Sequence, residues 1–180
     1  MWQEHDNQFD YWNIRVTRIN GDGEAIWWPD SKSVYHNLNG NQTDLVACSD
    51  GAGGVIVAWT DARFSDTDIY AQRIDSDGNV LWQASGNSLC DDETDQYKPA
   101  IVADGAGGAF ISWADERNDG SGDTFCQHID STGYALWAIN GVELCTASSP
   151  QTEVSIYPDG HGGAFFAWCD YRGMDEHGTL

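Results

Sequence analysis

Apolar residues gather in short runs along this chain, and three of the runs are apolar at almost every position. They are VIVAW at 55–59, AFISW at 109–113 and AFFAW at 164–168, and each follows a glycine-rich turn. A run without polar alternation is typical of a strand whose two faces are both covered. No window of the sequence shows the sustained period of an amphipathic helix. The pattern therefore predicts an all-β protein.

Four strand-like segments follow one another in the middle of the chain. The expected strands are PAIVAD, AFISWAD, TFCQHID and YALW, at 99–104, 109–115, 124–130 and 134–137. β-Branched and aromatic residues fill these segments, while Gly, Asp, Asn and Ser fill the gaps between them, as in hairpins. The third kind of segment alternates more than the second, so we expect it nearer to a sheet edge. The segments predict a four-stranded antiparallel sheet.

The same pattern returns at steps of 54 or 55 residues, which makes the chain a series of repeats. We place the units at approximately 1–43 (partial), 44–97, 98–152 and 153–180 (partial), within a single domain that spans 1–180. The anchors that share this period are Gly54, Gly108 and Gly163; Trp59, Trp113 and Trp168; Trp27, Trp82 and Trp137; and Gln42, Gln96 and Gln151.

Small repeated sheets of four antiparallel strands are what the blades of a β-propeller require. A linear β-solenoid is the main rival, although its coils are usually shorter and its strands parallel. The chain opens inside a repeat and closes inside another, and it holds material for about three blades. Since propellers close with roughly four to eight blades, we expect either a fragment of a longer propeller or chains that associate and complete one another's half-blades.

The motifs DGAGGxxxxWxDxR, DIYAQRIDSDGNVLW and NGVxLC resemble a bacterial β-propeller repeat of large secreted proteins, which often carry sorting or adhesion modules. The resemblance covers nearly the whole chain and implies a secreted or cell-surface location. A looser similarity joins the chain to Asp-box propellers, but Asp75 stands three residues before Gly78 where the usual box has two. The motifs are specific to the type of repeat and do not specify a ligand.

Residues that recur with the repeat are expected to hold the fold. The arginine of each WxDxR motif needs an acceptor, and its guanidinium fork suits a carboxylate or a strand-end carbonyl. We interpret the following repeated residues as structural: Gly54, Trp59, Asp61, Arg63, Trp82, Gly108, Trp113, Asp115, Arg117, Trp137, Gly163, Trp168, Asp170 and Arg172.

Function is expected where the copies differ. Trp12 and Trp28 lack repeat equivalents and are the candidates for a ligand-binding surface. His128 and His161 replace an arginine and an alanine of other copies, and neither has a visible catalytic partner at a recognised spacing. We therefore predict a non-enzymatic module for recognition of a protein or glycan, or for spacing other domains. The alternative is a carbohydrate-active enzyme with loop acids around a central pocket.

Charge narrows the choice of partners. Twenty-nine Asp and Glu against eight Lys and Arg give a formal net charge of -21, which repels nucleic acid and acidic membranes. No cofactor is predicted, except that the acidic loops at 91–96 and 118–123 offer oxygen ligands for calcium. The five cysteines lack CxxC spacing, so we predict neither a zinc site nor a complete disulfide framework.

Overall fold

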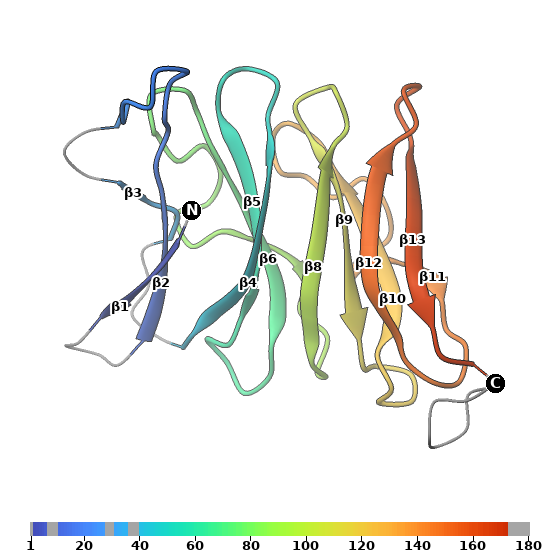
Figure 1. The fold of residues 1–180 in the computed structure, drawn as a ribbon. Helices are drawn as coiled ribbons and strands as arrows, with labels where there is room; N and C mark the ends of the chain where they lie inside the picture. Colours follow the sequence, from blue (N-terminus) through green and yellow to red (C-terminus); the bar gives the residue numbers. More distant parts are fainter. Residues whose placement is uncertain (1, 7–10, 28–30, 36–39, 173–180) are drawn as a thin grey trace.

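The computed structural model describes residues 2–6, 11–27, 31–35 and 40–172. Over these residues the chain is all β, as predicted, and contains no helix. Its strands form four antiparallel sheets, and no sheet closes on itself. The sheets follow one another in chain order across Figure 1, from the blue β1–β3 at one end to the red β12–β13 at the other.

Each sheet is a simple meander in which strands that are neighbours in sequence are also paired. Sheet 1 comprises β1 (Trp2–Asp6), β2 (Tyr11–Val16) and β3 (Lys32–Ser33). Sheet 2 comprises β4 (Gln42–Ser49), β5 (Val55–Asp61), β6 (Asp68–Ile74) and β7 (Asn87–Cys90). Sheet 3 comprises β8 (Gln96–Ala103), β9 (Ala109–Asp115), β10 (Asp123–Ile129) and β11 (Val142–Cys145). Sheet 4 comprises β12 (Gln151–Pro158) and β13 (Ala164–Asp170).

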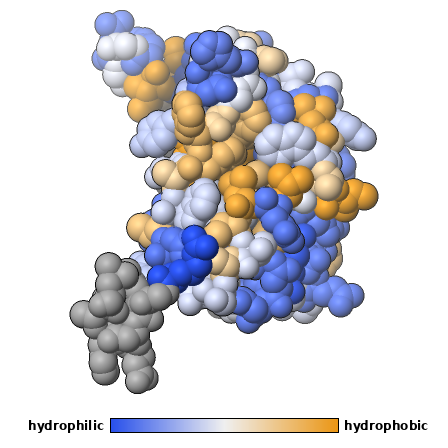
Figure 2. Space-filling model, turned by 90° about the vertical axis from the view of Figure 1, so that its right-hand side faces the viewer, coloured by the Kyte–Doolittle hydropathy of each residue, from blue (hydrophilic) through white to orange (hydrophobic). Residues whose placement is uncertain are grey.

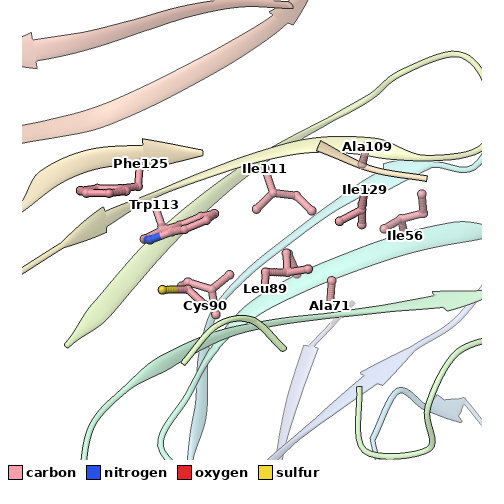
Figure 3. Packing of buried hydrophobic residues seen from close by; sticks show 11 residues of the cluster. Ile56, Ala71, Leu89, Cys90, Ala109, Ile111, Trp113, Phe125 and Ile129 are labelled. Carbon is pink, nitrogen blue, oxygen red and sulfur yellow. The ribbon is translucent and has the colours of Figure 1, made fainter. Parts of the chain in front are cut away.

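The cores lie between sheets. Figure 3 shows how Ile56, Leu89 and Cys90 of sheet 2 meet Ile111 and Trp113 of sheet 3. A second cluster joins sheets 1 and 2 around the buried Trp59. Residues of one strand therefore serve two cores in alternation, because successive side chains point to opposite faces. This explains why the second strand of a full sheet is apolar throughout.

The fourth strand differs from the expectation. Residues 134–137 make only an isolated bridge, Ile129↔Ala135, and the fourth strands are β7 and β11 further along the chain. The cause is the buried Gln127, whose Oε1 accepts from the Trp137 backbone N at 3.0 Å and whose Nε2 donates to the Ala138 carbonyl at 2.8 Å. A side chain thus satisfies the backbone groups that a strand ladder would use.

The third strands occupy the predicted residues, but they do not lie near a sheet edge as predicted. β6 and β10 each pair on both sides and are largely buried, so they are inner strands. Their alternation reflects the two different cores that they face. The N-terminal phase agrees with the sequence repeat, since Trp2 pairs with Arg15 as Trp59 pairs with Tyr70 and Trp113 with Phe125.

Candidate functional site

The first strands of sheets 2, 3 and 4 each carry a bulge at the same place. The bulged residues are Asp44, Lys98 and Glu153, with φ of 52, 54 and 57°. The ladder shifts register around each of them, between β4 and β5, between β8 and β9, and between β12 and β13. A residue other than glycine in this left-handed region is uncommon, and bulges re-aim side chains next to functional sites. The three positions share a backbone conformation, and two of them carry an acid while the third carries a lysine.

These three side chains line one pocket of about 360 Å³, because β8 lies against both β4 and β12. Leu45, Val46 and Val154 supply an apolar part of its wall. The pocket therefore combines two carboxylates, one ammonium and an aliphatic surface.

A threonine ties the first two bulges together. Thr60 Oγ1 donates to Asp44 Oδ2 at 3.0 Å and accepts from the Lys98 backbone N at 3.3 Å. Ala114 and Cys169 stand at the corresponding positions of the later copies. The orientation of the Asp44 carboxylate is thus fixed by a hydroxyl that the other copies lack.

The wall of the pocket also contains a buried amide. The Gln151 side chain is fully buried, and its Nε2 donates to the carbonyl of Ala147 at 2.9 Å and to that of Ser149. Its Oε1 is buried without a hydrogen-bond partner. The Oε1 of the repeat-equivalent Gln96 is buried in the same way, so this feature belongs to the repeat. With Asp44 and Glu153 on the same wall, the pocket favours ligands rich in hydroxyl, amide or ammonium donors.

The sequence did not single out Asp44, Lys98 and Glu153. Each follows a repeated glutamine by two residues, as in QTD, QYK and QTE, and stands in a segment that otherwise becomes a strand. The one sequence feature that could have indicated the site is a charged residue near the start of every first strand. The left-handed conformation itself has no signature here, because none of the three is a glycine.

The predicted structural residues come together around the WxDxR motif. Asp115 is fully buried and accepts from Trp113 Nε1 at 2.9 Å and from Arg117 Nε at 2.8 Å. The Arg117 guanidinium also donates to the Asn140 carbonyl at 2.9 Å and lies over the ring of Phe125. Asp61 and Arg63 repeat this geometry with Trp59, while the pair Asp170 and Arg172 lies near the surface.

The glycine-rich turn is organised by the aspartate that opens it. Asp104 Oδ1 accepts from the backbone N of Ala106 at 2.7 Å and of Gly108 at 2.9 Å. A Cβ on Gly108 would stand 2.1 Å from the Ile129 carbonyl oxygen, so no other residue fits there. Gly54 and Gly163 hold the same place in the turns opened by Asp50 and Asp159.

The second tryptophan series joins one sheet to the next. Trp82 Nε1 donates to the Ser131 carbonyl at 3.2 Å, and the Arg73 guanidinium donates to the same oxygen at 2.9 Å. Trp27 and Arg18 make the corresponding contacts with the Ser76 carbonyl. Trp137 has no such contact among the described residues and is partly exposed.

The predicted ligand surface of Trp12 and Trp28 lies outside the side chains that the structure describes. Trp28 lies outside the described residues, and of Trp12 only the backbone in β2, opposite His5, is described. Trp168 packs half-buried on β13, and His161 lies in the exposed turn before it. His128 faces Asp104, with Nε2 3.0 Å from Oδ2, in the place of the Arg73–Asp50 ion pair.

The sequence patterns also gave no indication of two buried acids, Asp68 and Asp123. Asp68 pairs across the ladder with Asp61, and burial together with the nearby Asp66 and Asp91 raises its pKa to about 7. The equivalent Asp123 is buried opposite Asp115, and burial raises its pKa as well. Arg63 and Arg117 form ion pairs with the first acid of each pair, and among the described residues the second acid forms none.

In the two acidic loops, carboxylates accept hydrogen bonds from backbone N–H groups of the protein. Asp95 Oδ1 accepts from the Thr67 backbone N at 2.8 Å, and Asp119 Oδ1 accepts from the Ser121 backbone N at 2.9 Å. Across the described residues, no three His, Cys, Asp or Glu side chains are grouped as metal ligands. The five cysteines are all unpaired, and burial raises the pKa of the Cys90 and Cys126 thiols to about 12.

Comparison with protein-family models, with curated proteins and with solved structures finds no match. The likeness to secreted propeller repeats therefore stays a prediction from the sequence motifs. Within the described part of the chain, no helix is long and apolar enough to cross a membrane.

Proposed function

We propose that this chain is a non-enzymatic recognition module of β-propeller type, belonging to an exported protein, and that the pocket between β4, β8 and β12 binds its ligand. Four-stranded antiparallel meanders that stack with their first strands adjacent support the assignment of sheets 2 and 3 as blades. The observation that carries the proposal is the trio of left-handed residues, Asp44, Lys98 and Glu153, which present different charges around one pocket.

The ligand class follows from the wall of the pocket. The Asp44 and Glu153 carboxylates accept hydrogen bonds, the Lys98 ammonium donates, and the aliphatic residues cover an apolar face. Sugars match this set, because a ring carries several hydroxyl donors on its rim and C–H groups on its face. We therefore propose a glycan ligand.

A second candidate is a carbohydrate-active enzyme. The observation that favours it is that Asp44 and Glu153 line the same pocket, as a general acid and a base or nucleophile must. Asp44 is held by Thr60 in a fixed orientation, which either role requires.

A glycan array combined with a hydrolysis screen separates these functions. Binding without turnover, lost in Glu153→Gln and in Lys98→Ala but kept in the exposed loop variant Glu93→Gln, supports the recognition module. Turnover that disappears in Asp44→Asn and Glu153→Gln supports the enzyme. Binding that none of the pocket variants alters, or the absence of any glycan binding, rejects this pocket as a glycan site.

A further inference from the structure

The outer face of β13 is bare where its counterparts are buried. Phe165 is 67% exposed, whereas the residues at the same place of the repeat, Ile56 and Phe110, are 0% and 4% exposed. Ala167 and Cys169 are likewise exposed and have buried counterparts. Figure 2 looks onto this end of the stack and shows apolar residues gathered on it.

The edge of β13 is open as well. Among the residues that the structure describes, β5 pairs with β6 and β9 pairs with β10, but β13 pairs only with β12. An apolar strand with one free edge and one bare face is a site for another strand and another sheet. In repeat terms, sheet 4 has the first and second strands and lacks the third and fourth.

The opposite end of the stack has the complementary gap. Sheet 1 contains β2 and β3, the third and fourth strands, and its described residues include no counterpart of β4, β8 or β12. Leu45 and Val55, which face sheet 1, are only half-buried, whereas Pro99 and Ala109 at the same places of the next copy are buried. The apolar residues of sheet 2 that face sheet 1 are therefore partly exposed at the place where the first and second strands of a complete sheet 1 would cover them.

We propose that this end face binds a second copy of the chain, so that β12 and β13 of one copy and β2 and β3 of the other form one four-stranded sheet. The register follows from the complete sheets, where Ile56 pairs with Arg73 and Phe110 with His128. The same register places Phe165 opposite Arg18 of the second copy.

In a single chain, β1 pairs with part of the β2 edge to which β13 of the second copy would bind. β1 pairs with β2 no further than Trp2 opposite Arg15, and no other described residue pairs with the edge beside Arg18. β13 has seven residues where β1 has five, and it brings the apolar sequence AFFAW in place of WQEHD. In the composite sheet β13 takes the place of β1 along β2.

The association closes with two copies. Each joint unites a C-terminal half-sheet with an N-terminal half-sheet, and two identical joints related by a two-fold axis leave no end free. Two complete sheets from each chain and two composite sheets then make six, within the range of closed propellers. The proposed joint accordingly predicts a closed dimer of twice 19.8 kDa.

Light scattering after size exclusion tests the joint, at about 0.15 M salt to screen the two acidic chains. The wild type is expected to be dimeric, Phe165→Asp monomeric with an unchanged β circular-dichroism spectrum, and the control Phe64→Asp dimeric. Phe64 is also 67% exposed, but it lies in the loop after β5. A monomeric wild type, or a dimer that Phe165→Asp leaves intact, overturns the proposal.

Disulfide trapping tests the register without relying on a disruptive variant. The double variant Phe165→Cys, Arg18→Cys is expected to give a covalent dimer on a non-reducing gel after mild oxidation. Phe64→Cys, Arg18→Cys should give no more covalent dimer than the native cysteines give alone. Equal trapping in the two double variants overturns the proposed pairing. Neither experiment depends on whether the pocket binds a glycan.

Discussion

At the scale of single residues, the stability of each repeat depends on one buried carboxylate that holds several donors. Asp115 binds an indole, a guanidinium and the backbone N of Arg117 at once. A buried charge without its partner is strongly destabilising, so the arginine is needed chiefly to compensate the acid. The corresponding pair Asp170 and Arg172 is exposed to solvent, which screens both charges.

Arg117→Ala is therefore expected to lower the free energy of unfolding by about 3 kcal/mol, measured by urea denaturation. The matched variant Arg172→Ala, made in the Phe165→Asp background so that no second copy covers β13, removes the same contact where the arginine side chain is 61% exposed, and should cost less than about 1 kcal/mol. Equal effects of the two substitutions would show that burial does not decide the role of the motif.

Asp68 makes stability depend on pH in the opposite sense to an ion-paired acid. Its pKa in the folded protein is raised to about 7, above the ordinary 3.8, so the folded state keeps a proton that the unfolded chain loses. Stability therefore falls as the pH rises from about 4 to 7.

Asp68→Asn is expected to raise the free energy of unfolding at pH 8 by about 2 to 4 kcal/mol and to change it little at pH 4. Denaturation of both proteins at the two pH values measures this, with the exposed Asp77→Asn as the control. A stabilisation by Asp68→Asn that is as large at pH 4 as at pH 8 would contradict the assignment.

At the scale of elements, each sheet depends on a turn in which glycine has no substitute. In Gly108→Ala the new Cβ meets the Ile129 carbonyl and the Asp104 carboxylate, so the turn between β8 and β9 must distort. We expect a loss of about 2 kcal/mol or more in unfolding free energy. Gly21→Ala, with no atom within 4 Å of the added Cβ, should change stability by no more than about 0.5 kcal/mol. Comparable losses in both variants would argue against the close approach.

Local sequence predicted the elements whose cause is local. The apolar runs after the glycine turns are β5, β9 and β13, since turn chemistry and apolar patterning act over a few residues. The fourth strand was misplaced because the side chain of Gln127, ten residues before Trp137 on β10, binds the backbone of 137–138, and neither turn chemistry nor apolar patterning indicates such a contact. The pocket was missed for a similar reason, because it exists only where β4, β8 and β12 meet.

At the scale of the whole molecule, the sheets form a stack with two unlike ends. Inner strands have both edges paired and both faces covered. Among the described residues, β13 at the end of the stack has one paired edge and one exposed face. The net charge of -21 opposes association of two copies, so the joint must gain its free energy from apolar burial and strand pairing. Raising the salt concentration is accordingly expected to strengthen the dimer.

Amide hydrogen exchange of β13 tests this account most directly, because it compares equivalent strands within one sample. The account predicts that amides of Ala164–Asp170 exchange as slowly as those of Ala109–Asp115 in the wild-type protein and become fast in Phe165→Asp. Rapid exchange of β13 in the wild type, beside a protected β9, would contradict it.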